Sequence, residues 1–150
     1  MEETSPPTSD DWGDLAVDPE VEYGFGLFGG KTIVEACPLF VENPMERAAE
    51  LRYVPSAVFN YYVFCFVDRL LSAESKGESD MASCFLRLVR DRASSRPKDL
   101  EPIWGRLHPA VVHVAEAQAF YDADIDIYGS FPELLREIEV AAERQKRGGA

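Results

Sequence analysis

The stretch PSAVFNYYVFCFVDRLLS, residues 55–72, is the most strongly apolar segment of the 150-residue chain and decides its fold. Its apolar side chains recur with helical spacing, beginning at Val58 and Phe59 and ending at Leu70 and Leu71. Further apolar residues between them leave little polar surface around the helix. A helix that is apolar nearly all round lies in the centre of a core, and this run is too short to cross a bilayer. The segment is therefore predicted to be a buried central helix.

Further helices are predicted around this one from start signals and apolar periodicity. Asn43 and Pro44 are typical of a helix start, because the side chain of Asn43 can cap and proline fits the first helical position. Ser130 with Glu133 gives the same kind of signal before the last helix. The predicted helices cover residues of about 44–53, 55–72, 80–94, 99–107 (short), 109–121 and 131 onward.

A β-hairpin is predicted near the N-terminus, in VEYGFGLFGGKTIVEA, residues 21–36. Its Gly-Gly pair at 29–30 separates two β-prone runs, and both glycines can take the positive φ of a two-residue hairpin turn. The strands are expected near Val21–Phe28 and Lys31–Ala36. Because an isolated hairpin is only marginally stable, it is expected to pack on the helices.

Residues 1–20 are expected to form a disordered acidic tail. They are rich in Ser, Thr, Pro and acidic residues and lack the apolar periodicity that would offset the entropy of ordering. Residues 21–150 are expected to form one domain, which is an ordinary size for a single core. The predicted fold is mainly α: an irregular bundle of about five helices with one N-terminal β-hairpin.

The charge of the chain is strongly negative and unevenly placed. The formal net charge is −12, and the first 30 residues hold eight acidic residues and no Lys or Arg. Nucleic-acid binding is not expected, because it depends on Lys and Arg neutralising phosphates. A basic protein partner is favoured instead, since complementary charge accelerates encounter.

The glycine-rich sequence GFGLFGGKT, residues 24–32, resembles two nucleotide-binding motifs but does not meet the requirements of either. A P-loop requires glycine where Phe25 stands, and the GxGxxG spacing is not preceded by a buried strand. The residues that follow are β-branched and end in Pro38, so they are not expected to open a phosphate-binding helix. No cofactor is predicted.

The sequence DADIDIYGSFPE, residues 122–133, resembles the calcium-binding loop of EF-hand proteins. Asp122, Asp124 and Asp126 occupy the first, third and fifth places of the motif, and Glu133 occupies the twelfth. The sixth place, which needs glycine for a sharp turn, is Ile127. No second loop of this kind is present. No metal site is predicted, and a degenerate calcium-binding loop is kept only as an alternative.

No catalytic residues are predicted. The chain has no GxSxG or HExxH motif, and His108 and His113 are five residues apart, which places them on different sides of one helix. The three cysteines do not form a CxxC pair, and two of them lie in apolar segments, which is typical of a reducing cytoplasm. The N-terminus does not resemble a signal peptide.

The function expected from this profile is non-catalytic protein binding. Its most specific form is an immunity or antidote protein that masks a basic toxin; the alternatives are a regulatory or adaptor subunit and an enzyme with an unrecognised site. The loop before the last helix has acidic residues beside aromatic ones, a combination that concentrates energy at interfaces. The expected partner-binding residues are Asp122, Asp124, Asp126, Tyr128, Phe131 and, in DDWGDL, Trp12.

Overall fold

The computed structural model describes residues 5–148, with side chains described up to residue 144. Within these residues every regular element is a helix and there is no β-strand, so the mainly α prediction is confirmed. The elements are α1 (Ser9–Trp12), η1 (Leu15–Val17), α2 (Pro19–Phe28), α3 (Ile33–Glu42), α4 (Pro44–Leu51), α5 (Ser56–Leu70), η2 (Ala73–Ser75), α6 (Ser79–Ser95), η3 (Pro97–Ile103), α7 (Trp104–Glu116), α8 (Ile125–Tyr128) and α9 (Phe131–Gly148), where η marks a 3-10 helix.

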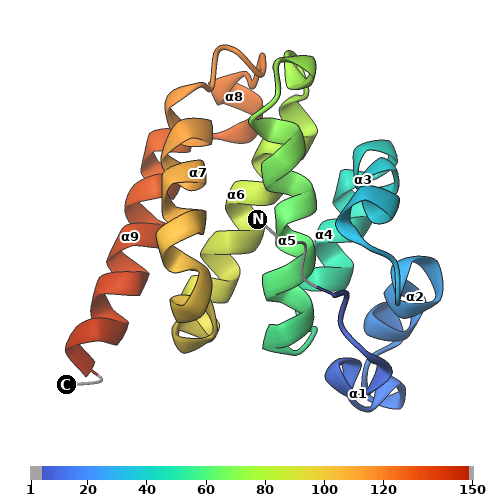
Figure 1. Ribbon diagram of the computed structural model, residues 1–150. Coiled ribbons are helices and arrows are strands. Elements are labelled where there is room, and N and C mark those ends of the chain that lie inside the picture. The colour runs from blue at the N-terminus through green and yellow to red at the C-terminus, as the bar shows by residue number, and fades with distance from the viewer. Residues whose placement is uncertain (1–4, 149–150) are drawn as a thin grey trace.

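The central helix predicted at residues 55–72 is α5, and its burial is confirmed. Nine of its side chains are buried, including Phe59, Tyr62 and Phe66. Figure 1 shows α5 in the middle of the molecule, with α2, α3 and α4 on one side and α6, α7 and α9 on the other. α3 packs on α5, and α9 packs on both α6 and α7. Burial of this apolar helix therefore organises the bundle.

The β-hairpin predicted at residues 21–36 is wrong, because both of its expected strands are helices. α2 begins where the side chain of Asp18 accepts a hydrogen bond from the backbone N–H of Glu20, with Pro19 at the first helical position. α3 begins with a capping box, in which Thr32 and Glu35 each bond the other's backbone N–H. Such caps satisfy the free N–H groups at a helix start.

The glycine pair that suggested a hairpin is instead a turn between two helices. Gly30 has a φ of 81°, which a residue with a side chain rarely adopts, so the reversal itself does require glycine. The hydroxyl of Tyr62 in α5 lies 2.7 Å from the carbonyl oxygen of Lys31 and 3.0 Å from that of Phe28. The turn is thus held against the central helix, a contact that no local sequence pattern reports.

The predicted disordered tail is also wrong where the structure describes it; residues 1–4 lie outside the described residues. Thr8 and Asp11 form a capping box at the start of α1. Trp12, in the same helix, is only 1% exposed and its ring lies 5.2 Å from that of Phe25 and 6.2 Å from that of Tyr62. One large aromatic side chain therefore fixes this acidic segment to the core.

The capping box of α3 gives a direct test of the helical N-terminal region. Thr32→Ala should lower the free energy of unfolding by about 1 kcal/mol, because the side chain accepts from the N–H of Glu35 at 3.2 Å. Thr32→Asn should keep nearly all of the stability, because Asn caps helices well, whereas Asn in a strand would be unfavourable. Urea unfolding followed by circular dichroism measures both, with the exposed Ser94→Ala as control. Equal losses for Thr32→Ala and Thr32→Asn would contradict this cap.

Candidate functional site

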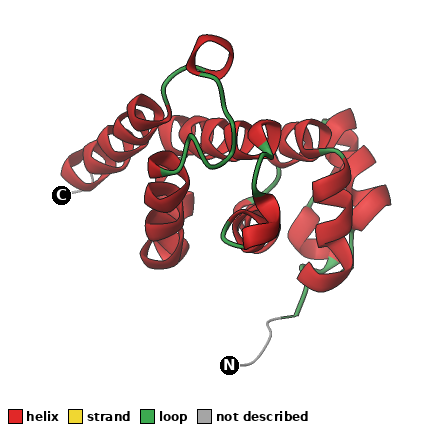
Figure 2. Cartoon of the chain, turned by 90° about the horizontal axis from the view of Figure 1, so that it is seen from above, coloured by secondary structure: helices red, strands yellow, loops and turns green. Residues whose placement is uncertain are grey.

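The segment between α7 and α9 is a compact turn that projects from the bundle. Asp122 adopts a positive φ of 56° and Gly129 one of 78°, so the chain reverses direction at both ends of the segment. Between them Asp124 caps α8, its carboxylate accepting from the backbone N–H of Asp126 at 2.8 Å. Figure 1 places α8 at one end of the bundle, and Figure 2 shows this short helix clear of the long helices.

This turn is held in one conformation by the side chain of Gln118, just after the end of α7, and by that of Arg87 in α6. The amide nitrogen of Gln118 donates to the carbonyl oxygens of Ala123, at 2.9 Å, and Gly129, at 2.8 Å. Arg87 in α6 donates from Nη2 to the carbonyl oxygen of Tyr128 at 2.6 Å. The bonds to Tyr128 and Gly129 satisfy backbone carbonyls at the C-terminal end of α8, and the bond to Ala123 holds the chain just before that helix. The segment is therefore an ordered element of the fold.

The three predicted aspartates of this segment lie together and are exposed. Asp122, Asp124 and Asp126 are all in the exposed class, and none of them forms an ion pair with another described side chain. Asp124 uses part of its hydrogen-bonding capacity to cap α8. The carboxylates therefore form an acidic surface without internal basic partners.

The two aromatic residues expected beside these acids, Tyr128 and Phe131, both make contacts within the protein. Phe131 is fully buried, and its backbone N–H donates to the side-chain oxygen of Gln118 at 2.9 Å. The hydroxyl of Tyr128 donates to Asp80 at 2.6 Å and lies 3.1 Å from the hydroxyl of Ser79. The bond to the Asp80 carboxylate raises the pKa of Tyr128. These side chains anchor the turn to α6 and to the core, so Phe131 cannot contact a partner in this conformation.

The third expected aromatic contact, Trp12, lies far from this turn in the fold. It packs against α2 and α5, as described above, and has almost no exposed surface. The described structure therefore does not bring Trp12 together with the acidic turn. Its role is in the core.

Two exposed isoleucines of the turn were not recognised from the sequence. Ile125 is 59% exposed and Ile127 is 74% exposed, although aliphatic side chains of this size usually pack inside. In the sequence, Ile127 stands out only as the residue that breaks the EF-hand pattern. The sequence feature that points to their exposure is the alternation Asp-Ile-Asp-Ile at 124–127. This alternation does not have the spacing that would put the two isoleucines on one buried face of a helix.

The residues that resemble an EF-hand loop have a different local structure. The middle of the motif is the helix α8, and Glu133 lies in the first turn of α9, where its N–H donates to Ser130. Among the described residues, no group of three or more His, Cys, Asp or Glu side chains is placed to hold a metal ion.

No protein-family model matches this chain, and neither does any curated protein or solved structure. Function is therefore argued from the chemistry of particular sites. Over residues 5–148, none of the helices combines the length and the apolar character that crossing a membrane requires.

Proposed function

We propose that this protein is a non-catalytic binding protein that docks on a basic protein partner through residues 122–127. The observation that carries the proposal is the exposed pair Ile125 and Ile127, set among three carboxylates on an ordered, projecting turn. Apolar side chains supply the burial energy of an interface, and charged groups around them select the partner. The most specific form of the proposal is an antidote that masks a basic toxin in the cytoplasm.

The anchoring of the turn supports binding without a large entropic penalty. A flexible loop must be immobilised when it docks, which reduces affinity, whereas a preformed one retains the interface energy. Gln118 and Arg87 already hold the backbone on both sides of α8. The same contacts keep the isoleucines from folding back into the core.

The net charge of −12 supports a basic partner rather than an acidic one. Exposed carboxylates that form no ion pair with the described side chains are available to intermolecular ion pairs, which mainly accelerate association. Such acceleration is reduced by salt, because the Debye length falls to about 8 Å at physiological ionic strength. An association rate that falls steeply with salt is therefore expected.

The test is capture from an extract of the source cells followed by measurement on the purified partner. Ile125→Ser with Ile127→Ser should weaken the affinity for that partner at least tenfold, since each buried isoleucine contributes about 1.5–3 kcal/mol. Val34→Ser is the matched control, because Val34 is 75% exposed on α3 and should leave the affinity unchanged. Equal affinities for the isoleucine variant and the wild type would contradict the proposed surface.

A second variant separates the role of charge from that of the apolar contact. Asp122, Asp124 and Asp126 are changed together to Asn, which tolerates the positive φ of residue 122 and still caps α8. The expected result is a slower association with a weaker salt dependence. Co-expression then distinguishes the subclasses: an antidote restores growth of cells that produce the partner, whereas a non-toxic partner indicates an adaptor.

A further inference from the structure

A cavity of about 530 Å³ lies where η3, α7 and the C-terminal half of α9 meet. In Figure 1 the start of α7 and the end of α9 lie at the opposite end of the bundle from α8. The cavity is therefore separate from the proposed docking turn. Its size is within the range of about 300–1,000 Å³ typical of small-molecule sites. Its lining combines apolar and acidic side chains, and both kinds matter for what it can bind.

The apolar part of the lining is flat and partly aromatic. Leu100, Ala93 and Val140 line the cavity together with the indole of Trp104. The ring of His108 is stacked on that indole, with the ring centres 4.8 Å apart and the planes 10° apart. His108 is fixed in turn by its Nε2, which is 2.8 Å from a carboxylate oxygen of Glu139. Trp104 is thereby held in place as a wall for a flat apolar group.

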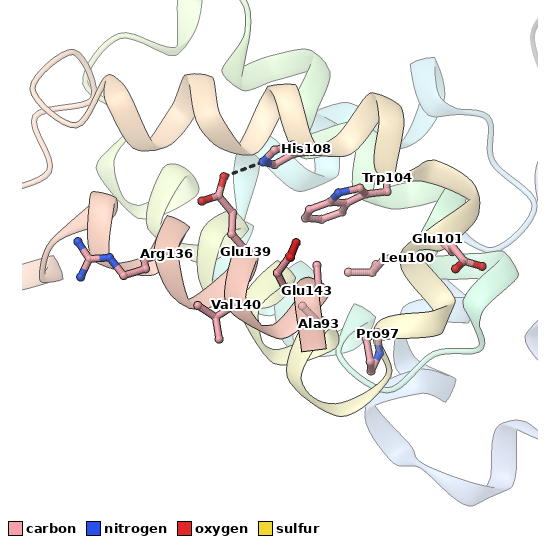
Figure 3. Close-up of a pocket in the computed structure, with 11 residues that line it drawn as sticks. Ala93, Pro97, Leu100, Glu101, Trp104, His108, Arg136, Glu139, Val140 and Glu143 are labelled. Carbon is pink, nitrogen blue, oxygen red and sulfur yellow. Dashed lines mark hydrogen bonds and ion pairs between the residues drawn. The ribbon is translucent and has the colours of Figure 1, made fainter. Parts of the chain in front are cut away.

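The acidic part of the lining is formed by two glutamates on one face of α9. Glu139 and Glu143 are one helical turn apart, and Figure 3 shows the carboxylate of Glu143 directed into the cavity towards Trp104. The guanidinium of Arg136, which also lines the cavity, turns away from it in the same view. Among the side chains that the structure describes, Glu143 has no ion-pair partner and Glu139 pairs only with His108.

This arrangement leaves an unfavourable interaction that a bound cation would relieve. Like charges at i and i+4 on a helix destabilise it. The side chain of Glu139 is 44% exposed and Glu143 is exposed, so both carboxylates are accessible to a ligand in the cavity. A cation between them gains charge-assisted hydrogen bonds to carboxylate oxygens, and the face of Trp104 attracts a cation as well. An anion would meet two carboxylates, and of the basic side chains that the structure describes along the lining, Arg136 is directed away and His108 is bonded to Glu139.

We propose that this cavity is a binding site for a small organic cation, an amidinium or guanidinium group carried on a flat apolar body. The planar group donates paired hydrogen bonds to Glu139 and Glu143, and its apolar body lies against Trp104 and Leu100. This site is additional to the proposed protein-binding function and does not depend on it.

Benzamidine is the probe, and benzamide, its neutral counterpart of the same shape, is the control ligand. Binding to ¹⁵N-labelled protein is followed by NMR through the indole N–H signal of Trp104. Benzamidine should shift that signal in a saturable way and bind at least tenfold more tightly than benzamide. Equal affinities, or no shift of the Trp104 signal, would overturn the proposal.

Variants on α9 test whether the preference for a cationic ligand comes from the carboxylates of the cavity. Glu143→Gln should weaken benzamidine binding at least fivefold and leave benzamide binding unchanged. Glu133→Gln, an exposed change on the same helix outside the cavity, should affect neither ligand. Both variants are checked by circular dichroism and thermal unfolding, and a folded Glu143→Gln protein that binds benzamidine like the wild type would refute the proposed site.

Discussion

Trp12→Ala should lower the free energy of unfolding by about 3–5 kcal/mol, the range for removing a buried large aromatic side chain. The residue lies in a segment whose composition suggests a dispensable tail, yet its side chain is 1% exposed. Its ring contacts those of Phe25, Phe28 and Tyr62, with ring centres 5.2, 5.6 and 6.2 Å away. The alanine variant leaves a cavity between α2 and α5 that the surrounding rings cannot fully close.

Urea unfolding followed by circular dichroism measures this loss, because the variant removes a main fluorescent reporter. Tyr23→Ala is the control: Tyr23 is an aromatic residue on α2 that is 56% exposed, and its loss should be small. Trp12→Phe should cost much less than Trp12→Ala, since the indole N–H has no hydrogen-bond partner among the described residues. If Trp12→Ala is as stable as the wild type, residues 8–12 do not dock as described.

Arg47→Ala is expected to lower stability by a similar amount, about 3–5 kcal/mol at pH 7, because it strands a buried carboxylate. Glu50 is fully buried, and Arg47 is its partner through two bonds, Nε to Oε1 at 2.6 Å and Nη2 to Oε2 at 2.8 Å. Replacing both residues, as Arg47→Met with Glu50→Leu, should recover most of the loss. A buried ion pair is often no more stabilising than apolar side chains of similar volume.

The pH dependence of this variant has a defined sign. Burial raises the pKa of the Glu50 carboxyl, and the bonds from Arg47 oppose that shift. In Arg47→Ala those bonds are absent, so the pKa of Glu50 in the folded variant rises further above its value in the unfolded chain. A carboxyl whose pKa is raised on folding stabilises the fold at low pH and loses that contribution as pH rises above its ordinary value of about 4.3.

The stability deficit of Arg47→Ala should therefore shrink as pH is lowered from 7 towards 5. Urea unfolding of wild type and variant at several pH values gives this difference directly. Glu42→Ala, a change at an exposed acidic residue at the end of α3, should show no comparable trend. A deficit that stays constant over this pH range would mean that Glu50 is not left charged and buried in the variant.

The helices that the sequence predicted correctly are those whose apolar pattern is strong and local. The run at 55–72 has too many apolar residues for any surface position, and the structure buries it as α5. The third predicted helix, ending near residue 94, corresponds closely to α6, whose apolar face is buried. The arginines were expected off that face, but Arg92 is buried with it, where its guanidinium donates to the carbonyl oxygens of Arg52 and Val54. In these cases periodicity and packing agree.

The wrong β-hairpin prediction for residues 21–36 has a physical origin, because a hairpin and a pair of helices can share the same turn signal. A Gly-Gly pair between β-prone runs is compatible with a hairpin and equally with a turn between helices. Asp18 and Thr32 are typical helix-start residues, whereas Pro38 argues against a helix after residue 31. Pro38 lies inside α3, and Pro109 lies inside α7, which begins five residues earlier than predicted. Each proline removes one helical hydrogen bond, a loss that packing can offset.

The candidate docking site was predicted in part. The three aspartates are exposed, as their charge suggests, but the burial of Phe131 in the core and the bond of the half-buried Tyr128 to Asp80 depend on contacts distant in sequence. The cavity could not be predicted, because Leu100 and Trp104 lie about forty residues before Glu143 in the chain. Only the packing of α9 against α7 and η3 brings them together.

The two hydrogen bonds from Gln118 have a consequence for how the docking surface can evolve. Because one amide holds both Ala123 and Gly129, the five residues between them form a closed cassette attached to the bundle at its base. If the turn is the docking surface that we propose, substitutions at Ile125, Asp126 and Ile127 would alter what it recognises and leave the contacts of Gln118 intact. Recognition and folding stability would then depend on separate residues, so the one could change without loss of the other.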